Sequence, residues 1–447
     1  MRRRSLASMM MLLLLLVPSC GGTRSEGPDV PPTAAPPATI APSAEAGVDG
    51  DSNPEVDASE STKLHGELRT LEGLRVLRVW GTPTQMGHAH GMLLRDEIIE
   101  IVDGYALDVI PPATLDAAGV LYTTVAQIPP RLREEAEGVI AGMKAAGGAE
   151  IPALGRELRV ADLLVLNAMT DLLAIGCSSV SAWGTSTEGA PGLLGAPVMV
   201  RNLDWSDDPE LLRNQIVFAF EPDDPQRQPV ISVAFAGYLG CLSCMNEAGV
   251  SALFNMGYGD GAASASEALR GFSPANLLLR DALEQRDVDG DGTSTADDVE
   301  AIWKHETHAG SYILHLLEPR RGSDHAPARV LEVEADGMAV RHPEDDELGG
   351  RILAATNHLR DKTAPSACSR YATIEATVES RAHRLDHDSL WQLGARLRLD
   401  EVVHTLLIEP EARALGVWLR APGQARSARP APVRLEWDVL LGPRRAQ

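Results

Sequence analysis

The sequence predicts an α+β protein in which β-sheets stack on each other and helices cover them. Helical periodicity dominates residues 63–176, where apolar residues recur at three- and four-residue spacing. After Asp204 the pattern changes to short runs that are apolar on both faces, at residues 215–220, 229–235 and 250–254. A strand buried on both faces needs a packed layer on each side, so these runs favour stacked sheets.

Length and charge limit the classes of protein that the chain can belong to. Its 447 residues, 44% of them hydrophobic, suffice for one large domain or two smaller ones. The formal net charge of −23 would repel a phosphate backbone, so nucleic acid is not an expected partner.

Residues 1–20 have the pattern of an export signal. Arginines at 2–4 precede an apolar run at 9–17, which is short for a membrane-spanning helix. The run ends in Leu-Val-Pro-Ser-Cys, which resembles a bacterial lipobox and predicts lipidation of Cys20. The alternative is an ordinary cleaved signal in which Cys20 is incidental. In both cases we expect an exported protein, and lipidation would anchor it to a membrane on the periplasmic or cell-surface face.

Residues 21–62 predict a disordered linker. They are rich in Pro, Ala, Ser, Glu and Gly and contain almost no large apolar side chain. Such a segment cannot bury enough surface to fold. We expect a flexible tether between the anchor and the folded part.

The next elements are a strand at 74–80 and three helices. The first helix begins near Met86, and the second spans residues 131–148. The third begins at Ala161 and runs toward Cys177. His88 and His90 form a His-x-His pair at the start of the first helix. Residues two apart on a helix do not share a face, so we expect packing and capping roles for them, not a metal site.

The most informative stretch is Gly176-Cys177-Ser178-Ser179, followed by Arg201-Asn202-Leu203-Asp204-Trp205. Cys177 could act as a nucleophile through its thiol. If the bond after Gly176 were cut, Cys177 would also carry a free α-amine with a pKa of about 7.7–8.0, which suits a general base. The alternative is a buried structural cysteine, the usual state of a free cysteine.

These motifs resemble the N-terminal-nucleophile (Ntn) hydrolases, in particular the acyl-coenzyme A:6-aminopenicillanic acid acyltransferase-like family. Its relatives include choloylglycine hydrolases and acid-ceramidase-like amidases. The resemblance implies a four-layer αββα sandwich and self-cleavage between Gly176 and Cys177. It also implies a helical α-chain of residues 63–176 that stays associated with a β-chain of residues 177–447. Ser178 and Ser179 stand where the family more often has Thr-Ser.

The resemblance also implies further site residues. Asn357, at the end of an apolar strand, would donate to the oxyanion, and Asn246 in an Asn-Glu-x-Gly turn could do the same. The predicted catalytic set is Cys177, Arg201, Asp204, Asn246, Asn357, Ser369 and Arg370. Within it, Arg201 and Asp204 would orient the new α-amine and the thiolate. His404 lies in an apolar strand and is expected to be a core group.

Three further cysteines leave their pairing open. Cys241 and Cys244 could form a redox pair, but no thioredoxin-like pattern surrounds them. A structural disulfide, with or without Cys368, is the plainer expectation for an exported protein. The last strands are expected at 414–419 and 433–440.

An acidic loop at 287–298 predicts structural calcium. Calcium loops of this kind have oxygen ligands at positions one, three and five, a backbone carbonyl at seven and a carboxylate at twelve. The residues at these positions are Asp287, Asp289, Asp291, Thr293 and Asp298. The loop resembles half of a dockerin-type EF-hand, and a solvated acidic loop is the alternative. The sequence shows a single such loop, which does not support a scaffold-docking function.

The sequence therefore predicts an enzyme that cleaves a linear amide C–N bond of a small N-acylated substrate through an acyl-enzyme on Cys177. No cofactor is expected for catalysis. The alternatives are an acyltransferase that passes the acyl group to an amine, and a non-catalytic surface binding protein stabilised by calcium. The identity of the substrate is not encoded in any recognisable motif.

Overall fold

The computed structural model describes residues 64–171, 175–259, 261–262, 269, 271–322, 325–345, 348–349, 351–361 and 368–442. The predicted export signal with Cys20 and the predicted linker 21–62 lie outside these residues. Within the described ranges, none of the helices has the length and apolar character needed to cross a membrane.

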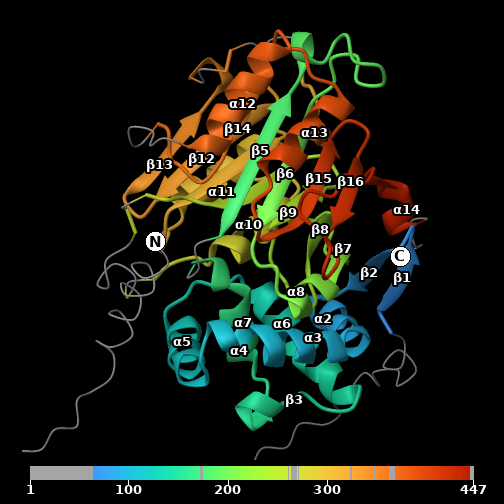
Figure 1. Ribbon diagram of the computed structural model, residues 1–447. Helices are drawn as coiled ribbons and strands as arrows, with labels where there is room; N and C mark the ends of the chain where they lie inside the picture. The colour runs from blue at the N-terminus through green and yellow to red at the C-terminus, as the bar shows by residue number, and fades with distance from the viewer. Residues whose placement is uncertain are drawn as a thin grey trace, which may run out of the picture.

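Two large β-sheets form the centre of the molecule (Figure 1). The nine-stranded sheet contains, in spatial order, β1 (Gly66–Leu71), β2 (Leu74–Gly81), β7 (Gln215–Pro222), β8 (Val230–Phe235), β9 (Ser243–Asn246), β10 (Ser251–Met256), β11 (Tyr312–Leu317), β12 (Ala328–Glu334) and β13 (Gly337–Arg341). The six-stranded sheet contains β14 (Ile352–Ala355), β5 (Gly176–Ala182), β6 (Val198–Asp204), β15 (Val402–Glu409), β16 (Ala414–Leu419) and β17 (Val433–Glu436). Strands β2 and β7 pair in parallel. A separate short pair joins β3 (Glu150–Ile151) to β4 (Arg156–Glu157).

The helices are described in two sets, an early group from the first part of the chain and the helices that follow it. The early group gathers at one end of the molecule in Figure 1 and consists of α2 (Pro83–Leu93), α3 (Arg95–Ile101), α4 (Leu107–Val109), α5 (Pro112–Thr124), α6 (Pro130–Ala145) and α7 (Val160–Asn167). The others are α8 (Pro209–Arg213), α10 (Ala275–Glu284), α11 (Ala296–His305), α12 (Ser369–Ser380), α13 (His387–Leu397) and α14 (Trp437–Leu441). A π-helix (Val102–Ala106) and short 3₁₀ turns complete the set.

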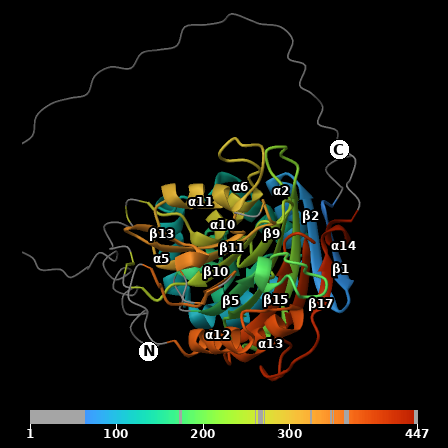
Figure 2. The same ribbon diagram turned by 90° about the horizontal axis from the view of Figure 1, so that it is seen from above.

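Apolar clusters show how these elements pack. One cluster lies between the two sheets, where β7, β8 and β10 meet β6 and β15. A second joins α12 and α13 to the outer face of the six-stranded sheet. Two more join the early helices, and α10 with α11, to the nine-stranded sheet. Figure 2 shows α12 and α13 on one side of the sheets and α10, α11 and α6 on the opposite side. The predicted mixture of helices and stacked sheets is confirmed.

Glycines set the closest helix contact, between α2 and α6. A Cβ atom on Gly87 would lie 2.0 Å from the Glu135 carbonyl oxygen, and one on Gly142 would lie 2.1 Å from the His88 carbonyl oxygen. Only glycine allows backbones to approach this closely. Nearby, the buried His90 ring accepts a hydrogen bond from the Gly237 N–H at 3.0 Å. Burial lowers the pKa of His90 to about 3, so it is a neutral core group.

Three predicted features differ from the structure. The segment 63–176, predicted to be helical apart from a strand at 74–80, also contains β1, which pairs with that strand, observed as β2, in the nine-stranded sheet. The helix expected to run toward Cys177 ends at Asn167, and residues 172–174 lie outside the described ranges. The strand expected at 433–440 ends at Glu436 and continues as α14. There the buried Trp437, Leu440 and Leu441 are spaced for one face of a helix.

Candidate active site

Strand β5 carries Cys177 in the middle of the packed layers. Every residue of this strand is buried, and Cys177 itself is fully inaccessible. Pairing with β6 sets Gly176 opposite Asp204, and pairing with β14 sets Ser179 opposite Ala355. Small side chains suit a strand that is covered on both faces. The register therefore brings the ends of β6 and β14 to the Gly176–Cys177 bond.

Asn357, which follows β14, spans the Gly176–Cys177 bond with its side chain. Its Oδ1 accepts a hydrogen bond from the Cys177 N–H at 2.9 Å. Its Nδ2 donates to the carbonyl oxygens of Ile175, at 3.1 Å, and Met256, at 2.8 Å. One fully buried amide thus holds the chain on both sides of the bond predicted to be cut.

Arg370, in the first turn of α12, ties three of the predicted residues together. Its Nη1 donates to the Cys177 carbonyl oxygen at 2.6 Å and lies 3.5 Å from Asp204 Oδ2. Its Nη2 donates to Asn357 Oδ1 at 2.6 Å. Ser369 begins the same helix and is exposed.

Arg201 reaches the thiol through a shared acceptor. Its Nη2 donates to the Phe254 carbonyl oxygen at 2.8 Å, and Cys177 Sγ donates to the same oxygen at 3.6 Å. Its Nε donates to Ser243 Oγ, which lies 3.1 Å from His404 Nε2. Burial and the nearby Arg201 hold the pKa of His404 well below its usual range, so His404 is a neutral core group.

Burial controls the protonation of both reactive groups. It raises the pKa of the Cys177 thiol, and the positive charge of Arg201 opposes part of that rise. It also raises the pKa of Asp204 to about 6, against the opposing charge of Arg370. The resting thiol is therefore protonated, and Asp204 changes charge close to neutral pH.

The structure does not bring Asn246 to this cluster. Its Oδ1 accepts from the Val250 N–H at 2.9 Å, which closes the turn between β9 and β10. Its Nδ2 donates to the Leu283 carbonyl oxygen at 3.1 Å and to Ser294 Oγ at 3.2 Å. The Asn246 amide is occupied in holding α10 and the acidic loop to the sheet, away from the Cys177 cluster that its predicted oxyanion role requires.

Two residues absent from the predicted set contact the chain next to the Gly176–Cys177 bond. Tyr258 donates its phenolic O–H to the Ile175 carbonyl oxygen at 3.3 Å. The Leu399 N–H donates to Asp204 Oδ1 at 3.0 Å, and its side chain lies against Gly176. Tyr258 follows β10 closely enough to have been a candidate. Leu399 carries no chemical signal in the sequence, because its backbone and its methyl groups make the contacts.

The cysteine pairing left open by the sequence is resolved. Cys241 and Cys244 form a disulfide, with Cα atoms 5.8 Å apart. Among the described cysteines, Cys177 and Cys368 are free. The disulfide lies beside α10, in the cluster that also contains Ala275. The structural interpretation of this pair therefore fits better than a redox role at an exposed site.

The acidic loop joins α10 to α11 and fits a cation in part. Oxygen atoms of Asp287, Asp289 and Asp291 lie within 4.8 Å of one another. Asp298 instead accepts hydrogen bonds from the Val288 and Thr295 N–H groups, both at 2.8 Å, and caps α11. Thr293 donates its hydroxyl to Asp291 at 2.6 Å. Three of the five predicted ligands thus share one face of the loop.

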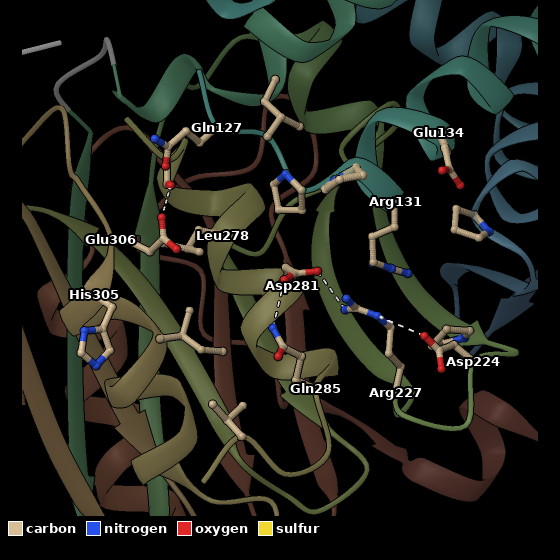
Figure 3. Close-up of a pocket in the computed structure, with 18 of the residues that line it drawn as sticks. Gln127, Arg131, Glu134, Asp224, Arg227, Leu278, Asp281, Gln285, His305 and Glu306 are labelled. Atoms are coloured by element: carbon tan, nitrogen blue, oxygen red, sulfur yellow. Dashed lines mark hydrogen bonds and ion pairs between the residues drawn. The ribbon is translucent and has the colours of Figure 1, made fainter. Parts of the chain in front are cut away.

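A cavity of about 1030 Å³ lies elsewhere, between α6, α10, α11 and the acidic loop (Figure 3). Its charged side chains pair with one another: Arg227 Nη1 lies 2.8 Å from Asp281 Oδ1, and Gln285 donates to Asp281 at 3.0 Å. Among the described residues that line it, none belongs to the predicted catalytic set. The cavity is therefore large but is not lined by the predicted nucleophile, Cys177.

Comparison of the sequence with protein-family models and with curated proteins gave no match. Solved structures with some similarity include an N-acylethanolamine-hydrolyzing acid amidase ortholog from Caenorhabditis elegans, at 18% identity and a TM-score of 0.39, covering 52% of this chain and 93% of that one. A mutant conjugated bile acid hydrolase from Clostridium perfringens has 10% identity and a TM-score of 0.33, covering 59% and 95%. TM-scores below 0.5 do not establish a common fold, so the residues of this chain have to carry its functional assignment.

Proposed function

We propose that the protein is a self-cleaving cysteine Ntn hydrolase that cleaves a linear amide C–N bond of an N-acylated substrate. The observation that carries this proposal is the position of Asn357, whose amide holds Cys177 N–H and the Ile175 carbonyl at the same time. Around it, Arg370 donates to the Cys177 carbonyl oxygen and lies beside Asp204, and Arg201 shares the Phe254 carbonyl oxygen with Cys177 Sγ. Such a concentration of shared contacts around a buried cysteine is expected of a reacting centre.

The packing of the molecule supports the fold that this class requires. Helices lie outside each of two sheets, whose apolar faces meet in a common cluster. We infer that this is the four-layer αββα sandwich. In that arrangement β5 lies in the central layers, which shields the thiol from bulk water.

Self-cleavage would be the first step. Cys177 Sγ attacks the Gly176 carbonyl carbon and forms a C–S bond; the C–N bond breaks, and the thiol proton passes to the departing Cys177 nitrogen. Water then hydrolyses the thioester and returns a proton to the sulfur. The new α-amine remains beside Asn357 Oδ1, 2.9 Å away in the continuous chain. Asp204 and Arg370 would orient it.

Substrate hydrolysis repeats this chemistry on another amide. The α-amine takes the thiol proton, Sγ attacks the substrate carbonyl, and the amine then protonates the leaving nitrogen. Once the new chain end at Gly176 withdraws, Asn357 Nδ2 loses its Ile175 acceptor and can donate to the oxyanion. Water completes the cycle by hydrolysing the thioester. We infer hydrolysis and not acyl transfer, because an exported enzyme would meet little acyl-coenzyme A.

We also propose that the acidic loop binds a calcium ion. Asp287, Asp289 and Asp291 would supply oxygen ligands at the spacing that calcium coordination needs. The ion would neutralise three carboxylates and stabilise the connection between α10 and α11. Its role would be structural, because the loop and the Cys177 cluster share no described hydrogen bond.

The proposed activity is tested with butanoyl, octanoyl and N-acetylglycyl p-nitroanilides. Release of p-nitroaniline is measured for the wild type and for Cys177→Ala, and the wild type is trapped and weighed for an acyl adduct. We expect release that depends on Cys177, with the added mass on the peptide that begins at Cys177. Equal release by both proteins would contradict the proposed nucleophile.

A further inference from the structure

The segment that ends at Gly176 supplies the first acyl group held by the proposed site. During self-cleavage the thioester on Cys177 carries the Gly176 carbonyl, with Ile175 attached behind it. Hydrolysis of a substrate forms the same kind of thioester on the same sulfur. The contacts of Ile175 and Gly176 therefore show what the acyl side of the site accepts. This inference rests on the function proposed above.

The carbon next to the scissile carbonyl has little room for a substituent. A Cβ atom built on Gly176 would lie 2.7 Å from Leu399 Cδ1 and 3.1 Å from Asp204 Cβ. The leucine side chain could turn away. Asp204 could not, because its Oδ1 accepts from the Leu399 N–H and its Oδ2 lies beside Arg370. An unbranched CH₂ group fits this position.

The carbonyl behind that CH₂ group is held by two donors. Asn357 Nδ2 and the Tyr258 hydroxyl donate to the Ile175 oxygen at 3.1 and 3.3 Å. Asn357 is fully buried, whereas Tyr258 is 48% exposed at the edge of the site. In a bound substrate Asn357 Nδ2 donates to the oxyanion, so an acceptor at this point would satisfy the Tyr258 hydroxyl, and a hydrocarbon chain would leave that hydroxyl without its partner.

The group beyond the carbonyl lies in an apolar environment. Ile175 is 3% exposed and belongs to the cluster formed by the early helices, which also contains Met169 and Leu203. An aliphatic group of similar size would be buried there, whereas a charged group would lose its hydration.

We propose that the preferred substrates are N-acylated glycine amides of peptide-like form. In them the scissile carbonyl belongs to glycine, an amide carbonyl takes the place of the Ile175 oxygen, and an aliphatic group follows it. The leaving group is an amine on the other side of the scissile bond. Alanine at the glycine position and a plain alkyl chain in place of the amide are the two disfavoured alternatives.

The test uses three p-nitroanilides of equal length on the mature protein. They are N-acetyl-isoleucyl-glycine, N-acetyl-isoleucyl-alanine, and a straight alkanoyl chain that lacks the internal amide. We expect kcat/KM for the glycine compound to exceed that for the alanine compound by about 10–200-fold, the usual effect of one methyl group in a closed pocket. Its advantage over the alkanoyl compound should be about tenfold or more.

Two variants assign each preference to its cause. Leu399→Ala should narrow the gap in kcat/KM between glycine and alanine only in part, because Asp204 Cβ still lies close to the added methyl group. Tyr258→Phe should narrow only the gap between the amide and the alkyl chain. Ile302→Ala, an aliphatic truncation in the wall of the Figure 3 cavity, is the control and should change neither ratio. Equal rates on glycine and alanine, or faster cleavage of the alkanoyl compound, would overturn the inference while Cys177-dependent hydrolysis keeps the proposed function. If none of the three compounds is cleaved, the inference fails, and the butanoyl and octanoyl anilides decide the function separately.

Discussion

The Cys177 site and the cavity between α6, α10 and α11 use polar groups in opposite ways. At Cys177 few polar side chains are present, and they share acceptors: Asn357 Oδ1 serves both the cysteine N–H and Arg370. In the cavity, Arg227 and Asp281 pair with each other and point at no common atom. Polar groups that share acceptors around a nucleophile therefore identify a site better than volume does.

The largest expected effect separates these two regions. Cys177→Ala should lower amide hydrolysis by about 10⁴-fold or more, because it removes the nucleophile itself. Arg227→Ala, in the cavity, should leave kcat/KM within about twofold and cost about 1 kcal/mol of stability at most, as expected for an ion pair near the surface. The measurement is steady-state release of p-nitroaniline together with thermal unfolding. If Arg227→Ala lost more kcat/KM than Cys177→Ala, the active site would have to be assigned to the cavity.

Asn357, at the Cys177 site, and Asn246, outside it, allow the same comparison with a single residue type. Asn357→Ala should lower kcat by about 10²–10³-fold, because an oxyanion donor is lost. Asn246→Ala should leave kcat nearly unchanged and lower the free energy of unfolding by about 1–3 kcal/mol, because buried partners are left unpaired. Kinetics and urea unfolding of both variants check this. Equal losses of kcat would show that Asn246 acts in catalysis after all.

The pH dependence should report Asp204. Burial favours its neutral acid, so the folded protein keeps the proton up to a pKa of about 6, against 3.8 as the ordinary value. Two effects follow as pH rises through this window: the stabilising preference for the neutral form is lost, and the carboxylate that would orient the α-amine appears. We expect kcat/KM to rise around pH 6 as Asp204 ionises, ahead of the further rise at about pH 7.7–8.0, where the α-amine loses its proton. In Asp204→Asn the rise of kcat/KM around pH 6 should be missing. An unchanged pH profile would exclude Asp204 as the titrating group.

The smallest effect concerns the acidic loop. Adding calcium to metal-free protein should raise the melting temperature by a few degrees, since ligand in 100-fold excess over its dissociation constant stabilises by about 2.7 kcal/mol. Asp289→Ala should abolish this shift and leave kcat unchanged. A matched change at the capping residue, Asp298→Asn, should destabilise the protein with or without calcium. A melting temperature indifferent to calcium in the wild type would contradict the proposed ion.

Much of the site follows from short motifs on paired strands. Gly176, Cys177 and Asp204 could be predicted together because β5 and β6 are neighbours in the chain and pair in register. Asn246 lies apart from them because an asparagine in a tight turn can satisfy nearby backbone groups, a local choice that the motif does not reveal.

The residues that sequence reasoning missed depend on distant packing. Tyr258 and Leu399 meet at Gly176 only after β10 and the segment before β15 fold against β5. Likewise, the run at 433–440 has the composition of a strand, yet it turns into α14 because Trp437, Leu440 and Leu441 bury one helical face. Such contacts carry no periodic signal in a single sequence.

The central claim is that the bond between Gly176 and Cys177 is cut by Cys177 itself. Intact mass analysis of the purified wild type and of Cys177→Ala, each run on a denaturing gel, measures this directly. We predict two wild-type fragments, one of which begins at Cys177, and a Cys177→Ala chain that stays whole. An uncut wild-type chain, or a Cys177→Ala chain cut at the same bond, would contradict the account.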